Sequence, residues 1–151
     1  MIKPVLFCYD GSDGSKMALT AAGELVKPAE AVVLVVWKSA AVQLAEAGSF
    51  LVAIPNEGEI DEKEAALARQ IAVEGADEAR RRGYDASARV VQAAESVAQA
   101  IDELAQEIDA GLIVCGQRGR GAIGSALLGS VSHSLASRTK RPLLIAPQHP
   151  A

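Results

Sequence analysis

The sequence predicts an α/β fold: an open, doubly wound, five-stranded parallel sheet with helices on both faces, formed by a single domain over residues 1–151. Two observations predict it. Strand-like and helix-like patterns alternate along the whole chain, and the strand-like runs are continuously apolar, as strands covered on both faces require. The hydrophobic fraction of 50% includes only two Phe, two Tyr and one Trp, so Ala, Val, Leu and Ile must build the core.

The first part of the chain reads as strand, helix and strand. Pro4 to Tyr9 is a continuous apolar run, and a turn rich in Gly, Ser and Asp follows it at 10–15. The following helix carries apolar residues at 18, 19, 22, 25 and 26, and it stops at Lys27-Pro28. Val32 to Trp37 is a second strand of the buried type.

The second part repeats this alternation. Asp61 to Arg82 predicts a long helix that opens with acids and closes with arginines, which complements the helix dipole, and Gly83 suits the C′ position. The remaining elements are a strand at 86–91, a helix at 97–108 with apolar residues at i, i+4, i+7 and i+11, a strand at 112–115, a helix at 130–139 and a strand at 142–146.

The segment Lys38 to Glu59 has no clear periodicity. It carries six large apolar residues, which argues against disorder, and loops of this length are usually functional or disordered. A lid, a short extra helix and a partner contact all remain open for it.

Charge and cysteine content exclude several classes of protein. The net charge is −4, and no basic stripe interleaves with aromatic residues, so we expect no nucleic-acid binding. No apolar run is long enough for a membrane span or a signal sequence, so we expect no membrane partner and a cytoplasmic location. Cys8 and Cys115 lie inside apolar strand-like runs without a Cys-x-x-Cys motif, which favours small buried hydrophobes over a redox pair.

The most informative segment is rich in glycine and follows the fourth strand. Its glycines are Gly116, Gly119, Gly121, Gly124 and Gly129. A strand, a glycine-rich turn and a helix N-terminus together present N–H groups and a positive dipole end, which favour a bound anion. The segment therefore predicts a phosphate cradle.

Two familiar phosphate motifs do not fit this segment. In the P-loop spacing, Ser125 stands where the lysine belongs. Residues 119–124 do match G-x-G-x-x-G, but they follow the fourth strand, and the region where a ribose-binding acid belongs reads Thr139-Lys-Arg141.

A different spacing fits better. Gly116, Gly119, Gly129 and Ser130 form G-x2-G-x9-G-S, which resembles the nucleotide-binding signature of the universal stress protein family. The start Val5-Leu-Phe-Cys-Tyr-Asp-Gly-Ser12, the strand at 32–37 and the end Arg141-Pro-Leu-Leu-Ile-Ala-Pro147 also resemble family members, so the similarity covers essentially the full chain.

The resemblance implies a ligand, a site and a strand order. Family members with this motif bind ATP with a divalent cation, so it implies ATP with Mg²⁺ or Mn²⁺ held through the phosphates. The implied sheet order is 3-2-1-4-5, which makes the first and fourth strands central neighbours, with a crevice at their carboxyl ends. The nucleotide-binding residues that we assign on this basis are Tyr9, Asp10, Val36, Cys115, Gly116, Gly119, Gly129, Ser130, Val131 and Ser132.

Several of these residues also have purely structural explanations. Asp10 and Ser130 are residue types that cap helices, and Arg118 and Arg120 suit solvated loop charges. His133 suits a surface position on the last helix.

The expected function is that of an ATP-binding universal stress protein that acts as a nucleotide-responsive regulator in stress adaptation, as a homodimer paired through the last strand. The alternatives are a dimeric interaction scaffold without functional nucleotide binding, and a slow ATPase or autophosphorylating protein that uses Ser130 or Ser132. No catalytic constellation and no metal site of the protein's own is evident. A nucleotidyl transferase is excluded, because only His133 and His149 are present.

Overall fold

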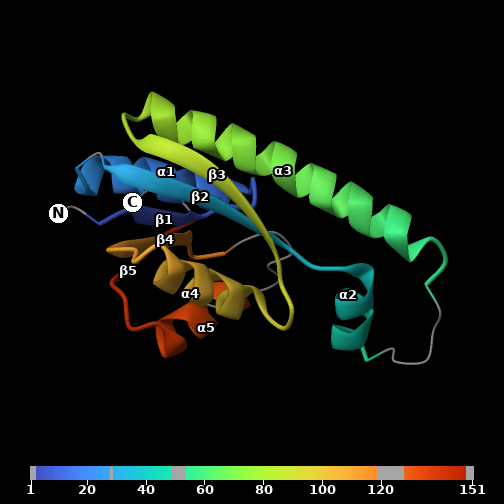
Figure 1. Cartoon of the computed structure of the whole chain (residues 1–151). Coiled ribbons are helices and arrows are strands. Elements are labelled where there is room, and N and C mark those ends of the chain that lie inside the picture. The colour runs from blue at the N-terminus through green and yellow to red at the C-terminus, as the bar shows by residue number, and fades with distance from the viewer. Residues whose placement is uncertain (1–2, 28, 49–53, 119–127, 149–151) are drawn as a thin grey trace.

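The computed structural model describes residues 3–27, 29–48, 54–118 and 128–148. Five parallel strands form one sheet in the order β3-β2-β1-β4-β5, with helices on both faces (Figure 1). This confirms the predicted fold class and strand order. The elements are β1 (Val5–Cys8), α1 (Asp13–Leu25), β2 (Glu30–Trp37), α2 (Ala40–Glu46), α3 (Glu57–Arg81), β3 (Asp85–Gln92), α4 (Val97–Glu107), β4 (Leu112–Gly116), α5 (Ser130–Arg138) and β5 (Leu143–Ala146).

The main difference from the sequence-based expectation lies between β2 and α3. The short helix α2 occupies part of the segment whose structure the sequence left open, and the Ser39 hydroxyl begins it by accepting from the Val42 N–H at 3.2 Å. Helix α3 begins at Glu57, one turn earlier than Asp61, because Glu57 and Glu59 already supply the acidic first turn that a helix dipole favours. Its end agrees with the expectation: Gly83 has φ +92°, as a C′ glycine requires.

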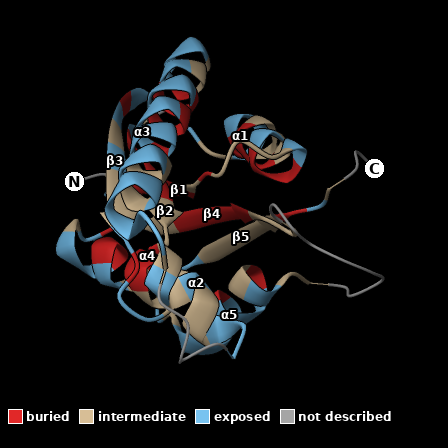
Figure 2. Cartoon of the chain, turned by 90° about the vertical axis from the view of Figure 1, so that its right-hand side faces the viewer, coloured by how far each residue is buried: buried red, intermediate tan, exposed pale blue. Residues whose placement is uncertain are grey.

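Two helical layers cover the sheet (Figure 2), with α1 and α3 on one face and α4 and α5 on the other. Successive strand residues contribute to opposite layers, so Val5 and Phe7 pack under α1 and α3, whereas Leu6 packs under α4 and α5. The ring of Phe7 meets that of Tyr84 edge to face, with centroids 5.2 Å apart. Burial on both faces explains why the strands are continuously apolar.

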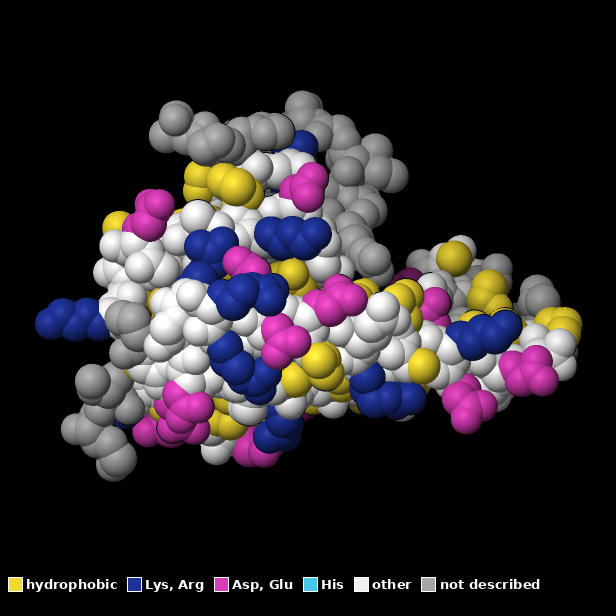
Figure 3. All heavy atoms as spheres, turned by 90° about the horizontal axis from the view of Figure 1, so that it is seen from above, with side chains coloured by type: hydrophobic (Ala, Val, Ile, Leu, Met, Phe, Trp, Pro, Cys, Tyr) yellow, Lys and Arg dark blue, Asp and Glu magenta, His cyan; other side chains and the backbone are white. Residues whose placement is uncertain are grey.

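The outer surface over α3 carries both charge signs side by side (Figure 3). Arg80 pairs with Asp77, and Arg81 and Arg82 both pair with Glu78. This interspersed pattern differs from the basic stripe of a nucleic-acid-binding face. Within the described ranges, no helix is both long and apolar enough to cross a membrane.

Helix α3 approaches the sheet closely at one glycine. A Cβ atom placed on Gly75 would lie 2.7 Å from the Tyr9 ring and 2.9 Å from a Val33 methyl group. Both neighbours are buried and held by the sheet, so they have little room to move. Gly75 therefore sets the distance between α3 and the sheet.

We expect Gly75→Ala to lower the free energy of unfolding by about 1–3 kcal/mol through overpacking, although alanine favours helix. Gly58→Ala is the matched control, because it lies in the same helix and its added Cβ meets no atom within 4 Å. The control should raise stability by up to about 1 kcal/mol. Urea unfolding measures both, and changes of the same sign would contradict the packing argument.

Candidate functional site

A cavity of about 650 Å³ lies at the carboxyl ends of the central strands. It opens where β1, β2 and β4 end and where α5 begins, so the neighbouring strands β1 and β4 bring the Asp10 turn and the Gly116 loop to one crevice, as the sequence predicted. Its volume falls in the range of small-molecule sites. The assigned residues that line it are Tyr9, Asp10, Val36, Cys115, Gly116, Gly129, Ser130, Val131 and Ser132. Gly119, the remaining one, lies outside the described residues.

One wall of this cavity is apolar. Leu34 and Val36 at the end of β2 face the same side of the sheet as Val97 and Ile101 of α4, and all four line the cavity. Leu34 and Ile101 are almost fully buried, so they continue the hydrophobic core into the cavity wall.

No side chain of the described residues caps the N-terminus of α5. Ser12, Ser39 and Ser96 each cap their own helix with a hydroxyl that accepts a backbone N–H, but the N-cap of α5 is Gly129, which has no side chain to do so. Ser130 is therefore not the N-cap; it is the first residue of the helix and is exposed. Among the described residues, the N–H groups of Ser130, Val131 and Ser132 have no acceptor, and these residues line the cavity.

Hydrogen bonds to the Gln117 carbonyl hold this helix end in place. The Gly129 N–H donates to Gln117 O at 2.8 Å, and the Ser132 hydroxyl donates to the same oxygen at 3.0 Å. The Ser132 hydroxyl also reaches Gly129 O at 3.0 Å, and the residue is only 2% exposed. Ser132 therefore positions the α5 terminus from its buried side, whereas Ser130 faces solvent.

Glycines bring the first turn of α1 against the end of β4. A Cβ on Gly116 would lie 2.7 Å from Gly14 O, and a Cβ on Gly14 would overlap the Arg118 carbonyl oxygen. The obstructing atoms belong to the backbone, which cannot swing away as a side chain can. Gly116 thus has a packing role in addition to the one expected from its place in the glycine motif.

The turn after β1 is shaped by its own side chains. An Asp10 carboxylate oxygen accepts the Ser12 N–H at 2.9 Å, and the Ser12 hydroxyl caps α1 by accepting the Ser15 N–H at 3.2 Å. Asp10 is therefore not the cap of α1. It fixes the turn that carries the cap, at the edge of the cavity.

Tyr9 borders the cavity but sends its ring toward α3. The ring packs at Gly75 in the layer formed with α1 and α3, and the Tyr9 N–H donates to Leu34 O at 2.9 Å. Burial, followed by the charges of Glu74 and Glu78 on α3, raises the pKa of the Tyr9 hydroxyl. Tyr9 thus joins the ends of β1 and β2 through its backbone.

The two cysteines lie side by side in the cavity wall. Phe7 and Val114 are register partners in the parallel pair, so Cys8 and Cys115 occupy the next positions of β1 and β4. Cys115 is buried and Cys8 is half-buried, as free thiols. Burial raises the pKa of Cys115 to about 11, and burial, then the neighbouring Cys115 and Asp10, raises that of Cys8.

The far end of the cavity is built by residues that the sequence did not identify. Lys38, Gln43 and Glu46 reach it from α2 and the loop before it, and Glu64 reaches it from α3. Lys38 and Glu46 form an ion pair at 2.8 Å. The signal for α2 was present in Ser39 followed by good helix formers, but its seven residues are too few to show a helical period.

The described residues include no group of three or more His, Cys, Asp or Glu side chains that could hold a metal ion. His133 is exposed on α5, as expected for a surface residue. Arg118 lines the cavity.

Solved structures of similar fold cover nearly the whole chain. The hypothetical protein MJ0577 has 20% identity and a TM-score of 0.79, with 100% of this chain and 99% of that chain covered. UspA from Lactobacillus plantarum has 18% identity and a TM-score of 0.74, over 95% and 97% of the two chains. A universal stress protein solved in complex with cAMP has 26% identity and a TM-score of 0.65, over 98% of each.

A comparison with curated proteins gives no significant match. The model of the universal stress protein family, in contrast, matches residues 1–147. The five-stranded parallel sheet and its strand order agree with that match. The chain belongs to the universal stress protein family.

Proposed function

We propose that this protein binds an adenine nucleotide, ATP in the first place, in the cavity between β1, β4 and α5, and that it acts in the cytoplasm as a nucleotide-responsive regulator in stress adaptation. The observation that carries the proposal is the N-terminus of α5, where the described residues offer no acceptor to the first N–H groups and which opens onto a cavity with an apolar wall. Such a cavity suits a ligand that is flat and apolar at one end and anionic at the other.

The apolar wall suits the adenine ring. Leu34 and Val36 together with Ile101 offer a hydrophobic surface at the carboxyl end of β2. Asp10, at the end of β1, supplies a carboxylate beside this wall, where it can accept hydrogen bonds from ribose hydroxyls.

The α5 terminus suits the phosphates. Hydrogen bonds to charged groups contribute about 1.5–3 kcal/mol each, and the helix dipole adds roughly 0.3–1 kcal/mol. Gly129 and Ser130 supply the start of this anion site, and Gln117 O orients it by binding Gly129 and Ser132. Arg118 adds a positive charge to the lining.

The relative solved with cAMP supports an adenine nucleotide as the ligand class, since its chain is 26% identical and 98% covered. The G-x2-G-x9-G-S spacing supports ATP within that class. A divalent cation such as Mg²⁺ or Mn²⁺ would be held mainly by the phosphate oxygens, because the described residues offer no three-ligand group for it. Such a cation would neutralise part of the negative charge of the phosphates.

Catalysis is not part of the proposal. The Ser132 hydroxyl is buried and gives its one proton to the carbonyls of Gln117 and Gly129, which leaves exposed Ser130 as the better candidate for slow autophosphorylation. The interaction scaffold without nucleotide stays the alternative from another class, and ligand analysis separates the two.

The direct test is to identify what the purified protein binds. We expect the denatured protein to release adenine nucleotide, and calorimetric titration of nucleotide-free protein to show saturable binding of ATP, AMP or cAMP. Guanosine triphosphate is the control for the base. If no adenine nucleotide binds, nucleotide binding is refuted and the interaction scaffold is the function that remains.

Ser130→Glu tests the phosphate end, because it places a negative charge where the phosphates would lie. We expect ATP to bind at least about tenfold more weakly, since like charges at an interface cost several kcal/mol. The fold should be unharmed, because an acid in the first turn favours a helix. Ser134→Glu is the matched control: it adds the same charge to an exposed position one turn further along α5. If both variants bind ATP with equal affinity, the phosphates do not lie at the N-terminus of α5.

Alkylation of the two thiols tests whether the ligand covers the cavity wall. Because their pKa values are raised, the thiolate fraction at pH 8 is lower than in a free cysteine, and the rate with iodoacetamide should keep rising about tenfold per pH unit beyond pH 9. Saturating ATP should make alkylation slower than in nucleotide-free protein at the same pH, because both cysteines line the cavity. Mass spectrometry follows both residues, and protein unfolded in urea is the control. Unchanged rates with ATP would exclude a ligand at this wall.

We also propose a homodimer through β5. This strand is at the edge of the sheet and pairs with β4 alone among the described strands, and its Leu143, Leu144 and Ile145 are only half-buried. Such an edge would otherwise be prone to aggregate. Light scattering after size-exclusion chromatography should give twice the chain mass of 15.6 kDa at micromolar concentration. A monomer mass that is independent of concentration would refute the dimer.

A further inference from the structure

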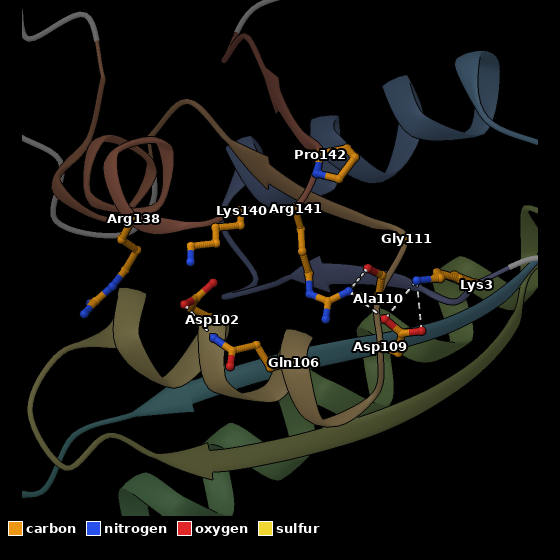
Figure 4. A pocket seen from close by; sticks show the side chains of 10 residues that line it. All are labelled: Lys3, Asp102, Gln106, Asp109, Ala110, Gly111, Arg138, Lys140, Arg141 and Pro142. Carbon is orange, nitrogen blue, oxygen red and sulfur yellow. Dashed lines mark hydrogen bonds and ion pairs between the residues drawn. The ribbon is translucent and has the colours of Figure 1, made fainter.

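A second cavity, of about 600 Å³, lies at the amino ends of the strands, opposite the end of the sheet that holds the first cavity (Figure 4). It is found at the amino ends of β4 and β5, where α4 and α5 end, so β4 runs from this cavity to the first one. None of the residues that line it lines the first cavity. It is therefore separate from the proposed nucleotide site.

The charge of this second cavity is opposite in sign to that of the chain. Four cationic side chains and two carboxylates line it, a net of +2, whereas the whole chain has a net charge of −4. The charged residues are Lys3, Arg138, Lys140, Arg141, Asp102 and Asp109. Three of the four cations come from residues 138–141, at the end of α5 and in the loop before β5, so local sequence concentrates the charge.

One half of the cavity is preorganised by Asp109. This residue adopts the left-handed conformation, with φ +50°, two residues after the end of α4. Its carboxylate pairs with Lys3 Nζ at 2.9 Å and with an Arg141 nitrogen at 3.0 Å, and Arg141 also donates to Ala110 O. These two cations lower the pKa of Asp109, so the group of three stays ionised with one positive charge in excess.

The other half holds Lys140. In Figure 4 its amino group points toward Asp102, whose carboxylate accepts a hydrogen bond from Gln106 at 3.1 Å. Lys140 itself is exposed and makes no hydrogen bond or ion pair with the described residues. It is a cation beside the cavity that the fold does not use.

The two helix ends account for part of this charge. Each C-terminus carries about half a negative charge, so α4 and α5 together offset roughly one of the two excess positive charges. At the end of α4, the Ala105 and Gln106 carbonyls accept the N–H groups of Ala110 and Asp109. A positive excess therefore remains in the cavity.

We propose that this cavity is a second ligand site, which takes a small multivalent oxyanion carrying phosphate or carboxylate groups. The anion lies between the Arg141 guanidinium, whose planar fork suits such groups, and the Lys140 amine. Asp109 holds Arg141 in place, and Asp102 weakens the site by repelling the ligand.

The test is a titration of isotope-labelled full-length protein with inorganic pyrophosphate or citrate at constant ionic strength, followed by NMR. We expect saturable shifts of the Ala110, Gly111 and Arg141 amides, and the more effective probe identifies phosphate or carboxylate as the preferred group. The Ser130 and Val131 amides report separately on the first cavity, so failure there leaves this result intact. Absence of saturable shifts at Ala110 and Gly111 with both probes would overturn the proposal.

Three variants test the roles of the residues. Lys140→Ala should weaken binding about fivefold, as expected for one exposed charge, without unfolding the protein. Asp102→Asn should tighten binding severalfold, because it removes the repelling carboxylate; a purely structural role would not produce this gain. Lys63→Ala is the matched control, an exposed lysine on α3 that lines neither cavity. An equal loss in Lys63→Ala and Lys140→Ala would show general screening of charge and overturn the site.

Discussion

The close packing of the first α1 turn against the end of β4 is the constraint on which the functional edge of this protein depends. Gly14 and Gly116 lack side chains at the point where the two backbones meet. Their contact places the Ser12 cap and the Asp10 turn beside the residues that follow β4. Gln117, which follows β4, then positions α5, since its carbonyl accepts hydrogen bonds from the start of that helix. One crowded junction thus positions three separate parts of the proposed site.

Backbone groups and side chains form different parts of the proposed site. The part of the cavity that suits phosphates consists largely of peptide groups, which are the same for any sequence. The part that suits a base consists of strand residues such as Val36 that belong to the hydrophobic layer under α4. The part that suits a base therefore belongs to the core packing as well as to the site.

Most of the fold could be predicted from the sequence because its signals are local and repeated. Apolar runs mark strands buried on both faces, and the Gly83 and Lys27 boundaries mark helix ends. The end of β1 and the end of β4 could be assigned to one crevice through the family resemblance. What could not be predicted rests on contacts between distant segments. The packing role of Gly116 depends on Gly14, and the structural role of Ser132 depends on Gln117 O.

The position of α2 and the start of α3 has a consequence for how the protein can diverge. Lys38, Gln43, Glu46 and Glu64 line the far end of the first cavity, yet none of them is buried in either core layer. Substitutions there change what the cavity presents to a ligand while the packing of the sheet stays as it is. At these four positions, specificity can therefore evolve at little cost in stability.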